Sequence, residues 1–348
     1  MSAATPVRVP ARSRTPPLFR LTPGVRVAEN VESGTPVAVT PDGRSFTLGA
    51  DLGALGRELA QGATTGEDLT ERLAPAGWDA WAVHEGLRVL LAQGLAQPQG
   101  GAVVRPRRRW SALSLGLFNP ESLCRRLVWW SYPLRGWWGL VLSVIGLAGQ
   151  IGLVVWLPAT VERPGGPALV ALGLLVVVTV CHELAHGVVL TAAGGHPQRM
   201  GLMLIYFLPA FFCDVADSIR LPRRAQLETA LAGLAVQCQL GFVLGAVALL
   251  GGPAVPGVSL FLTLNLMLAA ANLIPCLPLD GYIALAALLG RPDLRSHAIA
   301  AWRSVWRRPA DVERVSPGWL WVVFGALCQA APGLVALTVV GTFVIRLV

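Results

Sequence analysis

The sequence predicts a mainly α-helical, polytopic membrane protein with five to six membrane segments and a small N-terminal α/β domain of winged-helix-like type. Of its 348 residues, 54% are hydrophobic and only 14% are charged, and the mean hydropathy is +0.58. A soluble globular chain carries more charge and less apolar sequence. The apolar residues are also gathered in runs of about 20, the length that crosses a bilayer, and these runs follow a more polar first part.

The first part of the chain contains one segment expected to be disordered and one expected to fold. Residues 1–17 are polar and rich in Pro, Ser and Arg, without the apolar core of a secretory signal. Residues 18–100 carry the signals of a small domain. A β-hairpin is expected where 37–40 and 45–48 flank Asp42-Gly43, because an Asp-Gly pair tolerates the positive φ of a tight turn.

Three short helices are expected after this hairpin. They cover residues 52–60, a segment from Thr65 to Leu73 and residues 78–93. Thr65 supplies a capping hydroxyl followed by first-turn acids, and Gly94 is suited to end the third helix. The apolar side of that third helix is expected to hold Trp81, Leu87, Leu90 and Leu91.

A basic, Trp-rich segment at 101–138 is expected to be an interfacial linker between the domain and the first span. Its arginines are Arg105, Arg107, Arg108, Arg109, Arg125 and Arg126. Arginines also follow the second and fourth spans, and the positive-inside rule places these loops and the N-terminal domain in the cytoplasm. A nucleic-acid patch is the weaker interpretation of the basic run beside a membrane segment, so no nucleic acid is expected as a partner.

The membrane domain is expected at 139–348, in a cell membrane. Spans are predicted at 139–157, 168–190, 230–250 and 260–275, and 319–348 is long for one crossing and is interrupted by Pro332-Gly333. The shorter apolar stretch 201–213 is expected to form a membrane-level hairpin or a re-entrant segment. Six cysteines are scattered without a Cys-x-x-Cys pair, which argues against a disulfide framework.

The second span carries His-Glu-Leu-Ala-His at 182–186. In a helix, His182 and His186 lie one turn apart on one face, where both imidazoles can bind a single Zn²⁺. Glu183 stands beside them and can accept a proton from a metal-bound water. The alternative is a pair of helix histidines satisfied by hydrogen bonds or lining a polar cavity. Ionisable side chains within a membrane span are costly, which favours a functional site.

A catalytic zinc needs a third protein ligand and an open position. His196 follows the Gly194-Gly195 break and is not expected to contribute. The better candidate is Asp280, at the end of Asn-Leu-Ile-Pro-Cys-Leu-Pro-Leu-Asp-Gly, where two prolines break the helix at membrane depth. Asp214 and Asp217 are expected to pair with Arg220, Arg223 or Arg224, with a zinc role as the less favoured alternative.

Together, the two motifs resemble those of the site-2 protease family of intramembrane zinc metalloproteases, over roughly residues 139–290, and most closely its bacterial branch of peptide zinc metalloproteases. The resemblance implies that His182, His186 and Asp280 are zinc ligands and that Glu183 is the general base. Asn272 matches the asparagine thought to hold substrate or stabilise the oxyanion. The chain has Asn-Leu-Ile-Pro where many members have Asn-Pro-x-Pro, and it has no PDZ-like insertion between the motifs.

The hairpin and three helices of 18–97 resemble the small peptide-binding domain of pyrroloquinoline-quinone biosynthesis, the recognition element for ribosomally made, modified peptides. This resemblance implies binding of a leader peptide by strand addition. The alternative is a small regulatory or spacer domain that binds no peptide.

The expected function is removal of such a leader at the cytoplasmic membrane face by zinc-activated water. One alternative is regulated intramembrane proteolysis of a transmembrane signalling protein such as an anti-sigma factor. Another is a receptor or transporter with a structural metal site.

Overall fold

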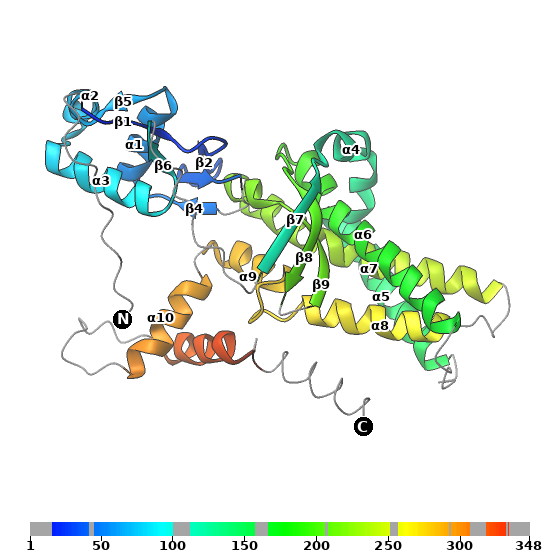
Figure 1. Cartoon of the computed structure of the whole chain (residues 1–348). Helices are drawn as coiled ribbons and strands as arrows, with labels where there is room; N and C mark the ends of the chain where they lie inside the picture. Colours follow the sequence, from blue (N-terminus) through cyan, green and yellow to red (C-terminus); the bar gives the residue numbers. More distant parts are fainter. Residues whose placement is uncertain are drawn as a thin grey trace. The chain divides into compact units, whose positions relative to one another are not determined.

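The computed structural model divides the chain into two compact units, Met1–Arg108 and Arg109–Val348 (Figure 1). It describes residues 16–41, 45–99, 112–156, 166–205, 208–250, 257–291, 294–306, 318–331 and 333. Several expectations therefore concern residues outside the described ones. These are the disorder of 1–15, the Asp42-Gly43 turn, the arginine run 105–109 and the second half of the segment 319–348.

Within its described residues, the first unit contains two three-stranded antiparallel sheets and three α-helices. One sheet has the order β5-β1-β6, and the other has the order β2-β3-β4. The strands are β1 (Leu18–Leu21), β2 (Arg26–Glu29), β3 (Pro36–Val39), β4 (Ser45–Thr47), β5 (Thr64–Thr65) and β6 (Ala96–Pro98). The expected hairpin is present as β3 paired with β4. The sequence analysis did not anticipate the other four strands.

The helices of this unit are α1 (Ala50–Ala60), α2 (Gly66–Leu73) and α3 (Ala80–Ala92), with a 3₁₀ turn η1 (Ala74–Ala76) between the last two. The predicted cap is confirmed, because the Thr65 hydroxyl accepts from the Asp68 amide and the Asp68 carboxylate accepts from the Thr65 amide. Gly94 has φ +74° just beyond α3.

Apolar side chains from all three helices form the core of the first unit. Leu55, Leu69 and Leu90 are each at most 1% exposed and belong to one cluster. The expectation for Trp81 was wrong, because its side chain is 74% exposed on α3. The apolar face of α3 is centred on Leu87 and Leu90 instead, and Trp81 lies outside that arc.

The described part of 101–138, which was expected to be an interfacial linker, contains regular secondary structure. Its first elements are β7 (Ala112–Phe118), α4 (Glu121–Arg126) and the 3₁₀ helix η2 (Val128–Leu134). The stretch expected to be a hairpin or a re-entrant segment forms an antiparallel hairpin of β8 (Met200–Ile205) and β9 (Leu208–Cys213). Strand β7 pairs with β8, which gives a sheet of order β7-β8-β9. The described part of 101–138 is therefore largely built into the second unit.

Three described helices are long and apolar enough to cross a membrane, over Gly136–Trp156, Ala168–Ala192 and Arg223–Ala248. They belong to α5 (Gly136–Trp156), α6 (Gly166–Ala192) and α7 (Arg223–Leu250). The fourth expected span, 260–275, corresponds to α8, which covers Val258–Asn272 and so ends three residues before the predicted end. It ends there because Pro275 lacks an amide hydrogen and disfavours helical geometry in the residue before it.

The remaining helices are η3 (Ala216–Arg220), α9 (Asp280–Leu289), α10 (Leu294–Trp306) and an apolar helix at Trp319–Ala331. Helix α7 contacts α5, α6, α8 and α9. Helix α6 also contacts β9. The second half of α6 carries the two histidines, and there it contacts α7 through Gly233 and β9 through Cys213.

Candidate metal centre

The two histidines of α6 are buried and face each other at their Nε2 atoms. His182 and His186 are both 4% exposed. Their Nε2 atoms are 3.2 Å apart, and the rings meet edge to face. Residues at i and i+4 share one face of a helix, which explains this pairing.

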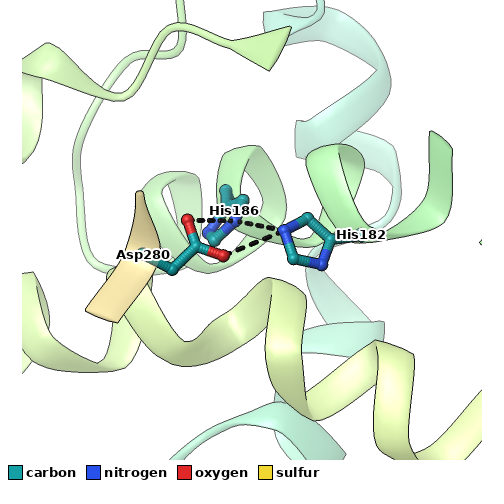
Figure 2. A group of neighbouring side chains, drawn as sticks. All are labelled: His182, His186 and Asp280. Carbon is teal, nitrogen blue, oxygen red and sulfur yellow. Dashed lines mark hydrogen bonds and ion pairs between the residues drawn. The ribbon is translucent and has the colours of Figure 1, made fainter. Parts of the chain in front are cut away.

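Asp280 reaches the same point from the N-terminus of α9. Its Oδ2 lies 3.0 Å from His182 Nε2, and its Oδ1 lies 3.4 Å from His186 Nε2 (Figure 2). Gly281 permits this approach, because a Cβ on it would come within 2.4 Å of the Leu273 carbonyl oxygen. The structure thus brings Asp280 to two histidines that lie almost a hundred positions earlier in the sequence.

The spacing of these side chains is close to that of a tetrahedral Zn²⁺ site. With Zn–N distances of about 2.0–2.1 Å, ligand atoms at tetrahedral angles lie about 3.3 Å apart. The two Nε2 atoms are 3.2 Å apart, and each faces a different oxygen of Asp280, at 3.0 and 3.4 Å. With one ligand atom taken from each residue, all three lie within 4.8 Å of one another. Asp280 Oδ2 is buried and accepts no hydrogen bond of acceptable geometry from another described residue. A cation among the three groups would satisfy it, and two imidazoles with one carboxylate are ordinary zinc ligands.

A backbone carbonyl fixes the orientation of one imidazole. His186 Nδ1 lies 2.7 Å from the carbonyl oxygen of Thr229 in α7. A carbonyl can only accept a hydrogen bond, so Nδ1 carries the proton and Nε2 keeps a free lone pair directed at the group. This outer contact is one that metal-binding histidines commonly make.

Glu183 is held by the sheet. Its Oε2 accepts a hydrogen bond of 2.8 Å from the backbone amide of Cys213, the last residue of β9. This bond orients the carboxylate next to His182. A carboxylate held in this way can accept a proton from a neighbouring water.

Gly233 of α7 is a site residue that the sequence analysis missed. A Cβ on Gly233 would lie 2.5 Å from both His182 Nε2 and His186 Nε2. Only a residue without a side chain fits there. No sequence signal marks Gly233, because its role depends on the rotation of α7 relative to α6.

The other candidates are not members of the group formed by His182, His186 and Asp280. Asn272 is the half-buried last residue of α8, and no hydrogen bond to another described residue holds its side chain. Asp214 lies 3.6 Å from Arg199, and Asp217 lies 2.8 Å from Arg220. The expected pairing is confirmed for Asp217, whose partner is Arg220. Asp214 forms an ion pair with Arg199, which is not among the three arginines predicted for it.

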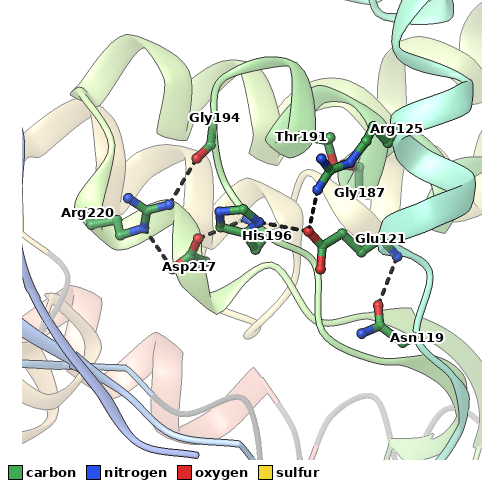
Figure 3. A network of polar contacts seen from close by, with 9 residues as sticks. All are labelled: Asn119, Glu121, Arg125, Gly187, Thr191, Gly194, His196, Asp217 and Arg220. Carbon is green, nitrogen blue, oxygen red and sulfur yellow. Dashed lines mark hydrogen bonds and ion pairs between the residues drawn. The ribbon is translucent and has the colours of Figure 1, made fainter.

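A polar network fixes the loop that follows α6 (Figure 3). His196 Nδ1 lies 3.0 Å from Glu121 Oε1, and the His196 amide donates to Asp217. Asp217 accepts from Arg220, whose guanidinium also donates to the Gly194 carbonyl at the end of α6. His196 thus has a structural partner in α4. Its hydrogen bond lowers the pKa of the Glu121 carboxyl, with a smaller contribution from Arg125.

Comparison with known proteins finds two relatives. The chain is 35% identical over 133 residues to "Zinc metalloprotease MJ0392" of Methanocaldococcus jannaschii, which is 37% of this chain and 37% of that protein. It is 32% identical over 174 residues to "Putative zinc metalloprotease Rip3" of Mycobacterium tuberculosis, which is 47% of this chain and 41% of that protein.

These matches span about two fifths of the length of either curated relative. No protein-family model and no solved structure matches the chain. The two relatives support the resemblance to site-2 proteases that the paired motifs carry.

Proposed function

We propose that this protein is a membrane-embedded zinc metalloprotease of the site-2 type, in which His182, His186 and Asp280 hold Zn²⁺. The observation that carries the proposal is the gathering of these three side chains in a buried position, with both Asp280 oxygens directed at the imidazoles and one ligand atom from each residue within 4.8 Å of the others. The names of the two relatives support both the metal and the reaction class.

Bound Zn²⁺ would supply a Lewis acid and lower the pKa of a bound water toward about 7. Glu183 accepts the proton of the attacking water and returns it to the leaving amine. The Cys213 amide keeps the Glu183 carboxylate in place for both transfers. Asn272, at the end of α8, is assigned to the substrate or to the oxyanion of the tetrahedral state.

The substrate must present an extended peptide segment, because a helix hides its carbonyl groups in hydrogen bonds. We assign substrate capture to the first unit. In the described residues, β2 and β4 each pair only with β3, so both edges of that sheet can accept another strand. A tethered binding unit raises the local concentration of the scissile segment, to roughly millimolar for a short flexible connection.

The proposed substrate is the precursor of a ribosomally made, modified peptide, and the proposed reaction removes its leader. We place the protein in the cell membrane with the first unit in the cytoplasm, because arginines are concentrated in the segments that flank the predicted spans on that side. The lipid bilayer is then the second partner of the chain.

Regulated cleavage of a transmembrane signalling protein, such as an anti-sigma factor, is the second candidate. It is favoured by the position of both histidines within α6, one of the three helices long enough to span a membrane. A receptor or transporter with a structural metal site is less well supported. Such a site has no use for the oriented carboxylate of Glu183.

The test is cleavage by the purified full-length protein in nanodiscs, with candidate precursor peptides and a single-span substrate read by mass spectrometry. The account predicts a discrete cut in the precursor that a chelator abolishes and Zn²⁺ restores. Glu183→Gln is the matched inactive control, since it keeps shape and removes the base. Cleavage of the single-span substrate alone would favour the second candidate, and cleavage by Glu183→Gln would refute the assigned mechanism.

A further inference from the structure

Three amide side chains meet in the interior of the second unit, away from the metal group. They are Gln150 of α5, Gln237 of α7 and Asn265 of α8, with exposed fractions of 1%, 1% and 0%. No acid, base or ligand of the proposed reaction belongs to this amide cluster. Buried polar groups of this kind are costly among membrane helices and call for an explanation.

The cluster joins three helices at one level of α7. Asn265 Nδ2 donates to Gln150 Oε1 at 2.8 Å and to the backbone carbonyl of Gln237 at 3.1 Å. Gln237 Nε2 donates to the backbone carbonyl of Asn265 at 3.2 Å. Gln150 Nε2 donates to the backbone carbonyls of Gln237 and Cys238, at 3.3 and 2.8 Å. The backbone of α7 is therefore held from two sides by directional bonds.

The same face of α7 touches the metal group one turn earlier. Gly233 precedes Gln237 by four residues, and Gly241 follows it by four. A Cβ on Gly241 would lie 2.4 Å from Asn265 Nδ2, as a Cβ on Gly233 would lie 2.5 Å from the two imidazoles. Residues at this spacing share one helix face. The rotation that places Gln237 in the cluster is thus the rotation that turns Gly233 to the histidines.

Apolar packing alone fixes this rotation poorly. In lipid there is no hydrophobic force between helices, and their contacts depend on packing and on hydrogen bonds. A slip of α7 by one residue turns it by about 100° and would bring Ala232 or Leu234 to the imidazoles. The cluster is also imperfect, since Gln237 Oε1 and Asn265 Oδ1 are buried and accept no hydrogen bond from any residue that the structure describes. Apolar residues would pack at lower cost, which points to orientation as its role.

We propose that the amide cluster sets the rotation of α7, so that Gln150, Gln237 and Asn265 are positioning residues that keep Gly233 against His182 and His186. The proposal rests on the proposed function for the metal group. It acts through helix orientation, and none of the three amides touches a ligand in the described contacts.

The test uses Asn265→Leu and Gln150→Leu in the full-length protein. Gln239→Leu is the matched control. Gln239 lies on α7, two residues after Gln237, and its side chain bonds to the Pro133 carbonyl and to Ser143, outside the cluster. Gln150→Glu, protonated in this buried place, keeps one donor and one acceptor and should preserve the orientation. Two measurements report the outcome.

The first measurement is the visible absorption spectrum of the Co²⁺-substituted protein, which reports ligand geometry without requiring activity. The leucine variants of the cluster should alter its bands and weaken Co²⁺ binding about tenfold or more, as for other outer-shell changes. Gln239→Leu and Gln150→Glu should match the wild type.

The second measurement needs no metal. Cys238 is 3% exposed on α7, and its labelling by a membrane-permeant maleimide, with the other cysteines replaced by serine, reports the rotation of α7. The cluster variants should label faster than Gln239→Leu.

If Asn265→Leu does not fold, Gln150→Leu, which removes only the α5 bonds, decides the matter. Folded cluster variants with wild-type Co²⁺ spectra and wild-type labelling would overturn the proposal. A wild-type protein that binds no Co²⁺ would instead refute the proposed function, while altered labelling would still support control of the rotation of α7.

Discussion

Gly233 and His182 are in contact across the α6–α7 interface, so closely that a Cβ on Gly233 would lie 2.5 Å from the Nε2 atom of His182. That Nε2 atom is also the one nearest Asp280, at 3.0 Å. Helix α7 therefore forms one wall of the metal group, and at position 233 it provides room for the imidazoles because glycine has no side chain. The identity of residue 233 limits what the group can bind.

Replacement of Gly233 by Ala should disrupt the metal group. The new methyl would meet both imidazoles, and relief of such overpacking costs about 1–3 kcal/mol and moves the ligands. We expect zinc affinity to fall by about tenfold to a hundredfold, measured by competition with a chromophoric chelator. Gly173→Ala on α6 is the control, since a Cβ there meets nothing within 4 Å. Equal zinc affinity in the two variants would contradict the assigned role.

Replacement of Asn272 by Ala should impair catalysis and spare the metal. If its amide stabilises the oxyanion, kcat should fall by about 10²–10³-fold with little change in KM. If the amide only holds substrate, KM should rise with kcat preserved. Zinc content should equal that of the wild type in either case. Unchanged kcat and KM would remove Asn272 from the site.

The Glu121–His196 contact should make stability depend on pH on the acid side. The pKa of the Glu121 carboxyl is lowered in the folded state. Glu121 therefore contributes stability above its unfolded pKa, and this contribution is lost as the pH falls through the folded pKa. Thermal unfolding in detergent between about pH 6 and pH 3.5 should show a shallower acid slope for Glu121→Gln than for the wild type. The difference at neutral pH should stay below about 1 kcal/mol, because the pair is partly exposed. Parallel slopes would show that the contact carries no linkage.

Replacement of Trp81 by Ala should weaken peptide binding by the first unit. Large exposed aromatic side chains are frequent anchors of interfaces, and loss of such an anchor costs about 2 kcal/mol, or roughly thirtyfold in Kd. Val31→Ala, at another exposed apolar side chain of this unit, is the control. Binding of a labelled precursor peptide to the full-length protein provides the measurement. A Kd equal to that of the control would place the peptide elsewhere.

The sequence predicts those parts of this fold that depend on local chemistry. The capping box at Thr65 and the hairpin of β3 and β4 follow from residue types within a few positions. The sequence between the two motifs does not indicate how far Asp280 lies from the two histidines. Their proximity was expected only because both motifs resemble those of one family. The structure then places the three side chains together.

The remaining features depend on contacts between distant segments. Strand β7 has alternating leucines, but the arginines and tryptophans around it suggested an interfacial segment, and its partner β8 lies far along the chain. Trp81 was assigned to a buried face on the helical period alone, although the core needs only a narrower arc of α3. The role of Gly233 and the amide cluster both depend on how α7 is rotated, which no local pattern of α7 encodes.

The most direct test of the account is the zinc content of purified protein, measured by elemental mass spectrometry after dialysis. We expect about one Zn²⁺ per chain in the wild type and in Glu183→Gln, and almost none in Asp280→Ala, because a three-ligand site loses its metal when one ligand is removed. Asp214→Asn, which alters a buried aspartate outside the group, should retain zinc. Full zinc content in Asp280→Ala, or none in the wild type, would contradict the metal centre.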